Sequence, residues 1–230
     1  MSYLWQEFNI KTFPAETLVF RDGVFCPDLS EYESVEYNDT KKLIFTKKTS
    51  KLPVHIIYIG EIAGNFDINI NLNAKNTNVF MTNKINIKTP AVLNIFIKNA
   101  GENSVFNGQV IVQNHSLLKL IINCEHLYEN TGIFVENRIL AHKNSETDLK
   151  AYAIIQKNMS KCYSDVSFSV MADLDTKIKM CPTQYIKSEP KSAKHSASLY
   201  IPDENQSEYL RGSGLNSLEI KNVLEEAFLS

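Results

Sequence analysis

The chain has 230 residues, 43% of them apolar and 22% charged, which is the composition of a globular protein with one sizeable core. Its 24 basic and 26 acidic residues leave a formal net charge of −2, which gives no electrostatic reason to expect a nucleic-acid or membrane partner. No apolar run reaches the roughly 18 residues of a membrane span. The N-terminus lacks the features of a signal peptide, so we expect a cytoplasmic protein.

Residues 17–198 are expected to form a β-rich core after an N-terminal extension of residues 1–16. Short runs of alternating apolar and polar residues recur along this part of the chain, as strands with one buried face require. Two series of apolar residues repeat at a spacing of 25 residues. They are Ile70, Ile95 and Leu120 in one series, and Ile85, Val110 and Val135 in the other. A fixed period of this kind is typical of stacked coils in a parallel β-solenoid.

The structural alternative is a β-sandwich built from hairpins. It predicts Asn-Gly or Asp-Gly turns between neighbouring strands, and we interpret one pair, Asp22-Gly23 at the N-terminal edge, as such a turn. The asparagine-rich stretch between residues 65 and 86 fits turns and polar faces instead, because asparagine tolerates left-handed backbone. We therefore prefer the solenoid.

Residues 199–230 are expected to form a short helical region. One helix follows Pro202-Asp203, Gly212 and Gly214 interrupt it, and Asn216 with Glu219 forms a capping box for a second helix. The apolar face of the second helix consists of Ile220, Val223, Leu224, Ala227 and Phe228. This helix either covers the open end of the solenoid or docks another protein, and both roles are compatible.

The four cysteines, Cys26, Cys124, Cys162 and Cys181, show no C-x-x-C or zinc-type spacing, and we interpret them as separate, mostly packed thiols. The sequence also lacks a P-loop, a G-x-S-x-G and an H-E-x-x-H motif. We therefore expect a protein that is not an enzyme.

Five segments resemble, in order, parts of the SufB/SufD family of iron–sulfur cluster assembly proteins. They are TLVFRDGVFCPDLS (17–30), LPVHIIYIG (52–60), NRILAHKNSETDLKAYAIIQ (137–156), DTKIKMCPTQYIKSEPKSAKHSAS (175–198) and DENQSEYLRGSGLNSLEIKNVLEEAF (203–228). The resemblance implies a right-handed parallel β-helix with a C-terminal helical region, and a short SufD-like scaffold. It also implies a homodimer or a heterodimer with another family member, and a SufC-like ABC ATPase as partner.

The resemblance points to Tyr209, Leu210, Leu215 and Leu218 as the ATPase-binding surface. It also assigns His195 as a metal ligand, with Cys181 as the nearest thiol in sequence. Where the SufD type has Cys-Ser-His-Gly-Ala, this chain has Ala193-Lys194-His195-Ser196-Ala197. We therefore expect no tightly bound cofactor, only a transient iron or iron–sulfur cluster at a shared interface.

Other interpretations stay open at this point. His195 is equally explained as a hydrogen-bonded histidine between the last coil and the helices, and Cys181 as a packed thiol. A structural or binding solenoid unrelated to iron–sulfur chemistry predicts that no ATPase binds. A carbohydrate-active β-helix predicts a groove of carboxylates, although Asp165, Asp173 and Asp175 cluster in one segment and do not recur with the coil period.

Overall fold

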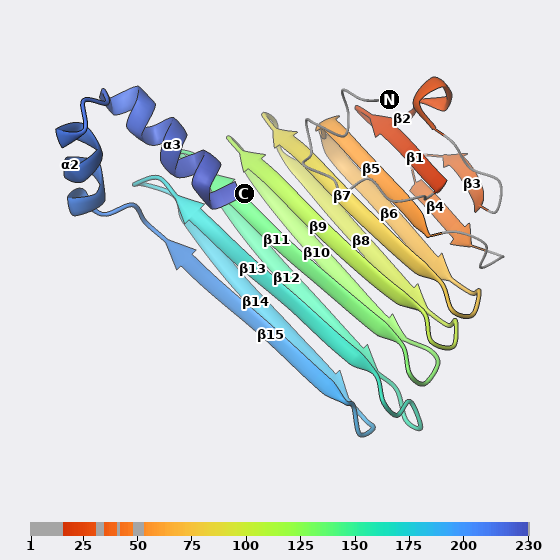
Figure 1. Ribbon diagram of the computed structural model, residues 1–230. Helices are drawn as coiled ribbons and strands as arrows, with labels where there is room; N and C mark the ends of the chain where they lie inside the picture. The colour runs from red at the N-terminus through yellow and green to blue at the C-terminus, as the bar shows by residue number, and fades with distance from the viewer. Residues whose placement is uncertain (1–15, 31–34, 41, 48–52, 230) are drawn as a thin grey trace.

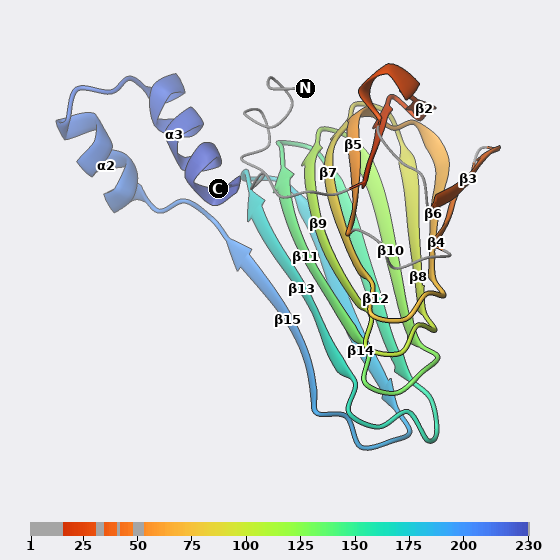
Figure 2. The same cartoon turned by 45° about the vertical axis from the view of Figure 1, so that its right-hand side comes forward.

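Two parallel sheets face each other over most of the molecule (Figures 1 and 2). A computed structural model describes residues 16–30, 35–40, 42–47 and 53–229. Sheet A contains, in spatial order, β15 (Ser192–Tyr200), β13 (Tyr163–Ala172), β11 (Gly132–Ala141), β9 (Val105–Asn114), β7 (Asn78–Ile87), β5 (Val54–Glu61), β1 (Glu16–Arg21) and β2 (Val24–Phe25). Sheet B contains β14 (Lys177–Ile186), β12 (Glu146–Ile155), β10 (Leu117–His126), β8 (Ala91–Asn99), β6 (Gly64–Leu72), β4 (Lys42–Lys47) and β3 (Val35–Thr40).

From β5 onward the chain alternates between the two sheets, so that each coil adds one strand to each sheet. Every neighbouring pair from β5 to β15 is parallel. The expected mainly β fold, a parallel β-solenoid followed by two helices, is therefore confirmed. The strands extend slightly beyond the expected core of residues 17–198, from Glu16 to Tyr200.

The predicted spacing of 25 residues is wrong for the central coils. Ile70, Ile95 and Leu120 are buried on β6, β8 and β10, as expected, but they do not share a row. Ile70 pairs with Ile97, and Leu120 pairs with Leu93. Val110 likewise pairs with Asn83 and not with Ile85. The register between these coils is 27 residues, so each predicted series moves two positions along its strand at every coil.

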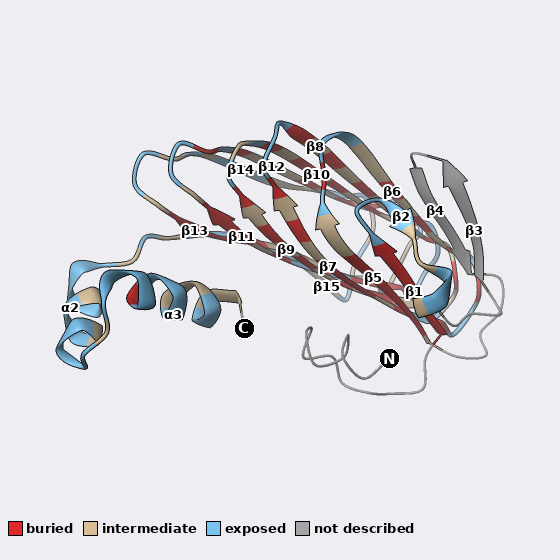
Figure 3. Ribbon diagram, turned by 90° about the horizontal axis from the view of Figure 1, so that it is seen from above, coloured by how far each residue is buried: buried red, intermediate tan, exposed pale blue. Residues whose placement is uncertain are grey.

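The core lies between the two sheets and is built from rows of stacked aliphatic side chains. Leu93, Leu120 and Leu149 form one such row on β8, β10 and β12, and each is 0% exposed. Figure 3 shows the alternation of buried and more exposed positions along the inner strands. Cys124 lies in this core, where burial raises the pKa of its thiol to about 12, so it packs as a small apolar side chain.

Asparagines in left-handed backbone set the turns on one edge of the solenoid. Asn76, Asn103 and Asn130 have φ of 54°, 57° and 57°. The Asn103 amide donates to Asn76 Oδ1 at 3.1 Å, and the Asn130 amide donates to Asn103 Oδ1. Asp22-Gly23 forms the turn of the antiparallel β1–β2 hairpin, with φ of 50° and 78°.

The C-terminal helices are α2 (Glu204–Gly212) and α3 (Ser217–Leu229). Asp203 caps α2 by accepting the Gln206 N–H at 2.7 Å, and the predicted Asn216–Glu219 capping box begins α3. Of the two roles considered for the second helix, covering the open end of the solenoid is not the one observed. Instead, α3 lies across the carboxyl ends of β11 and β13 (Figures 1 and 2). Neither described helix is long and apolar enough to cross a membrane.

A buried polar corner interrupts the aliphatic rows where β10 ends. The Thr131 hydroxyl lies 2.7 Å from His126 Nδ1 and 3.0 Å from Tyr128 O, so it joins the buried imidazole to the turn. His126 is 0% exposed, and burial lowers its pKa to about 4. Burial also lowers the pKa of His55, on β5, to about 4. Both histidines are therefore neutral in the native protein near pH 7.

Leu120→Ala tests the central row. The side chain is fully buried between two neighbouring leucines, so its removal should lower the free energy of unfolding by about 3 kcal/mol in urea denaturation. Leu117→Ala, on the same strand at 44% exposure, is the matched control and should change it by less than about 0.5 kcal/mol. Equal losses for the two variants would contradict the assigned face of β10.

Acid should destabilise the protein through His55 and His126. Their native pKa values lie below the unfolded value of 6.5, so the unfolded chain binds more protons as the pH falls. The contribution of the two histidines to the free energy of unfolding should be complete above pH 6.5. Between pH 6.5 and 4 it should fall, by up to about 1.4 kcal/mol per pH unit for each histidine. In urea titrations at several pH values, the free energy of unfolding of His126→Asn should fall less steeply with decreasing pH, because asparagine does not titrate. Asparagine should fit at this position, since Asn99 occupies the equivalent position one coil earlier.

Candidate interaction site

The last coil leaves the C-terminal end of the solenoid open. In the inner coils, inward-facing residues such as Leu149, Val166 and Phe168 are at most 1% exposed. Their partners on β14 and β15 are Met180, His195 and Ala197 in turn, and these three are half-buried or exposed. The difference arises because no further coil covers β14 and β15 in the described part of the chain.

Apolar side chains and strand edges occur together at this open end. Tyr185 and Ile186 at the end of β14 are 51% and 41% exposed, and Leu199 on β15 is 50% exposed. Among the described strands, β14 and β15 are the outermost of their sheets, so one side of each backbone has no partner from that set. The opposite end finishes in the antiparallel β1–β2 and β3–β4 hairpins. Because exposed edges with apolar neighbours favour association, the β14–β15 end is the candidate interaction site.

His195 and Cys181, the two predicted metal ligands, are not brought together. His195 lies on β15 in register with the inward-facing Val166. Cys181 lies on β14 in register with Lys150, which faces outward on sheet B. Both residues are exposed. Among the described residues, no group of three or more histidine, cysteine or acidic side chains could hold a metal ion.

The four residues of the predicted ATPase-binding surface divide into two pairs. Tyr209 on α2 and Leu218 on α3 are 76% and 68% exposed, although both are large and apolar. Leu210 and Leu215 are half-buried where α2 turns toward α3, and the Leu215 N–H donates to Leu210 O at 3.3 Å. Tyr209 and Leu218 are thus available to a partner, whereas Leu210 and Leu215 also hold the two helices together.

The predicted apolar face of α3 is only partly used against the solenoid. Ile220 is 4% exposed, Leu224 and Phe228 are half-buried, and Val223 and Ala227 are exposed. Polar contacts add to this small apolar contact. Arg138 Nη1 on β11 donates to Phe228 O at 3.1 Å, and Lys221 Nζ lies 2.9 Å from Asp173 Oδ2. Sequence periodicity identified the helix but not these polar contacts.

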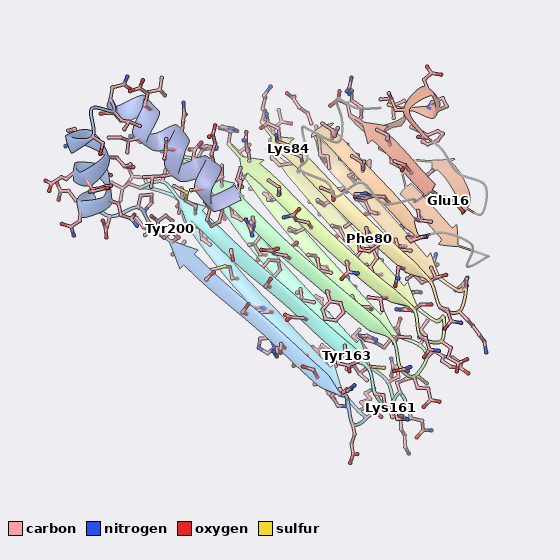
Figure 4. The ribbon with its side chains drawn as sticks, in the orientation of Figure 1. Glu16, Phe80, Lys84, Lys161, Tyr163 and Tyr200 are labelled. Carbon is pink, nitrogen blue, oxygen red and sulfur yellow. The ribbon has the colours of Figure 1, made fainter. Side chains whose placement is uncertain are left out.

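A groove of about 360 Å³ lies on sheet A. Two of the strands that line it are β13, which begins at Tyr163, and β15, which ends at Tyr200, and both tyrosines are labelled in Figure 4. Its lining residues come from β11, β13 and β15, and they are Phe134, Val135, Glu136, Asp165, Ser167 and Ser196. The groove is lined by two carboxylates, Glu136 and Asp165. Glu136 pairs with Arg138 Nε at 2.8 Å. Of the three aspartates noted in the sequence, only Asp165 lines the groove. Asp173 contacts α3, and Asp175 lies in a turn with φ of 65°.

No protein-family model matches the sequence, and a search of curated proteins finds no match. The resemblance to SufB and SufD therefore has no support from a family match. The structure shows a parallel β-solenoid with two C-terminal helices.

Proposed function

We propose that this protein is a SufB/SufD-like scaffold without catalytic activity of its own. In this role it pairs with a second solenoid through the β14–β15 end and carries a SufC-like ABC ATPase on its C-terminal helices. The observation that carries the proposal is the last coil, where residues in core-facing positions are exposed and where no other described strand pairs with the outer edges of β14 and β15. A solenoid partner would supply the missing coil, since its strands would extend both sheets and cover the inward-facing residues.

His195 is better placed for a metal site shared between two proteins than for a site formed by this chain alone. It lies in a core-facing row at the end where the partner would sit, so pairing would enclose it. A neutral imidazole is a good ligand for iron, but a cluster needs several ligands. In this proposal the cluster is cargo held between the two proteins, and His195 supplies one ligand. Cys181 faces outward, so it would need a different partner surface.

Pairing is tested by Leu199→Asp at the open end. Leu199 is 50% exposed, so the charge should leave the thermal midpoint nearly unchanged but should abolish association with a second copy or a longer family member. Sedimentation equilibrium measures this directly. The matched control is Leu218→Asp on α3, which is also exposed and should leave association intact. Wild-type protein that stays monomeric at high micromolar concentration and captures no solenoid partner would contradict the pairing.

ATPase docking is tested by the same two variants in the opposite sense. Leu218→Asp should abolish binding of the purified cognate ATPase, followed by calorimetric titration, while Leu199→Asp should retain it. Tyr209→Ala should weaken binding as well, because Tyr209 is the most exposed aromatic side chain of the helical region. No binding to the wild-type protein at about 100 μM would refute the docking surface.

The second candidate function is a carbohydrate-binding solenoid. The groove favours it, because Phe134 offers an aromatic face while Asp165, Ser167 and Ser196 offer hydrogen-bonding groups beside it. Oligosaccharide binding that is lost in Phe134→Ala, with no ATPase binding, would favour this candidate over the scaffold. If neither oligosaccharide nor ATPase binds, the remaining candidate is a structural solenoid unrelated to iron–sulfur chemistry.

A further inference from the structure

The open end of the solenoid carries opposite charge at its two edges. At one edge lie the turns that lead from β12 to β13 and from β14 to β15. These two turns expose Lys157, Lys161, Lys187 and Lys191 against one acidic residue, Glu189. None of the four lysines forms an ion pair with a described carboxylate. We call these four residues the lysine edge, and Figure 4 labels Lys161 on it.

The opposite edge of the same end is acidic. Helix α2 exposes Glu204 and Glu208, which are one turn apart, against a single basic residue, Arg211. Asp175 is exposed in the turn from β13 to β14 on this edge. We call Asp175, Glu204 and Glu208 the acidic edge, and none of them pairs with a cation of the described chain. Figures 1 and 2 show α2 beyond β15 in the stacking direction, so a partner stacked on β15 would lie beside α2.

The charges between α3 and the solenoid are paired within the chain. Lys221 Nζ lies 2.9 Å from Asp173 Oδ2 and 3.6 Å from Glu225 Oε1. His142 Nδ1 lies 3.7 Å and 3.8 Å from the same two oxygens. These contacts hold α3 on the solenoid, and α3 in turn packs against α2. The acidic residues of α2 are therefore positioned at the open end without being neutralised there.

Strand β15 presents a regular set of backbone groups to a partner. The Ser192 N–H donates to Cys162 O, so every second residue from Ser192 onward directs its N–H and C=O to β13. The residues that direct these groups to the outer edge are Ala193, His195, Ala197 and Leu199. Strand β14 is the poorer edge. Because the Lys177 N–H donates to Ser145 O, Pro182 falls in the outward-directed set, and proline has no N–H to offer.

Two two-fold arrangements of a second copy would continue both sheets. In the first, β15 pairs antiparallel with β15 of the copy, and in the second, β15 pairs antiparallel with β14 of the copy. The first arrangement reverses the strand direction between like sheets, so the acidic edge of each copy meets the lysine edge of the other. The second arrangement brings the two acidic edges together and the two lysine edges together. Charge complementarity therefore favours the first arrangement.

We propose that the occupant of the β14–β15 end is a second copy of this chain, joined by antiparallel pairing of the two β15 strands. In this dimer α2 of each copy docks against the lysine edge of the other. The inference rests on the proposed pairing at this end and names its partner and orientation. Full overlap of the two nine-residue strands places their midpoint, Ser196, on the two-fold axis. His195 of each copy then lies opposite Ala197 of the other. The dimer is closed, because both copies use the same surface.

Cross-linking at Ser196 tests the orientation. The backbone of Ser196 is directed to β13, so the two copies of this residue form a non-hydrogen-bonded pair with Cα atoms about 4.5 Å apart, which a disulfide can span. Cys181→Ser removes the exposed native thiol. In that background, diamide oxidation of Ser196→Cys at micromolar concentration should give a linked dimer on a non-reducing gel.

Ser167→Cys is the matched control for the cross-link. Ser167 lies in the same row, one strand further from the open end, so its two copies would be about 14 Å apart and should not link. The arrangement that pairs β15 with β14 of the copy predicts no link at Ser196 either, because the two Ser196 residues would then lie on opposite sheets.

Charge reversal tests the edge contacts. Glu204→Lys combined with Glu208→Lys should weaken self-association in sedimentation equilibrium at least about tenfold, because both identical contacts become repulsive. Lys187→Glu combined with Lys191→Glu should do the same. An equimolar mixture of the two double variants should associate as wild type does, since opposite charges meet again at both contacts. All four side chains are exposed, so the thermal midpoints should stay nearly unchanged.

The outcomes separate this inference from the proposed function. Self-association that gives no link through Ser196→Cys, or that both charge reversals leave unchanged, would overturn the inference while the proposed pairing stands. So would a wild-type protein that stays monomeric but binds a different solenoid at the end that Leu199→Asp disrupts. A wild-type protein that binds neither its own copy nor another solenoid would overturn both.

Discussion

The solenoid depends on the stacking of each inward-facing side chain between the coil before it and the coil after it. Leu120 is fully buried because Leu93 and Leu149 lie on its two sides in the same row. The parallel hydrogen bonds between coils hold such rows in register, and a slip of one residue would turn every apolar side chain outward. Buried polar residues obey the same constraint, since His126 lies in register with the buried Asn99 of the preceding coil.

This constraint also explains why the two ends of the molecule differ. At the N-terminal end, the β1–β2 and β3–β4 hairpins close the sheets with antiparallel strands. At the C-terminal end, β14 and β15 follow the pattern of an inner coil but have no coil beyond them in the described residues. Their inward-facing residues are therefore exposed for a reason of topology and not of composition. The helices do not change this, because α3 lies on the edge formed by the turns.

The sequence contained enough information to predict the fold class, but strand alternation alone could not fix the register. Apolar residues recur every two positions along a strand, so spacings of 25 and 27 residues match the alternation equally well. The turns were the better guide, because Asn76, Asn103 and Asn130 adopt left-handed backbone once per coil at the true spacing of 27. The helix caps at Asp203 and Asn216 were predictable because they depend on local hydrogen bonds. The contacts of His142 were not, since they join residues from two turns and a helix distant in sequence.

The constant strand length also determines how far apart the two ends of the solenoid lie. The strands β7, β9, β11 and β13 have ten residues each. The number of residues per coil differs because the turns differ in length, and the strands keep the same length. Each coil advances the solenoid by about 4.8 Å, which places β15 about 24 Å from β5. Residues 78–104 form one such unit, and their removal would join Thr77 to Val105 at a position equivalent to the natural Ser104–Val105 link. The separation between the two ends of this protein can therefore change by whole coils while the chemistry at each end stays the same.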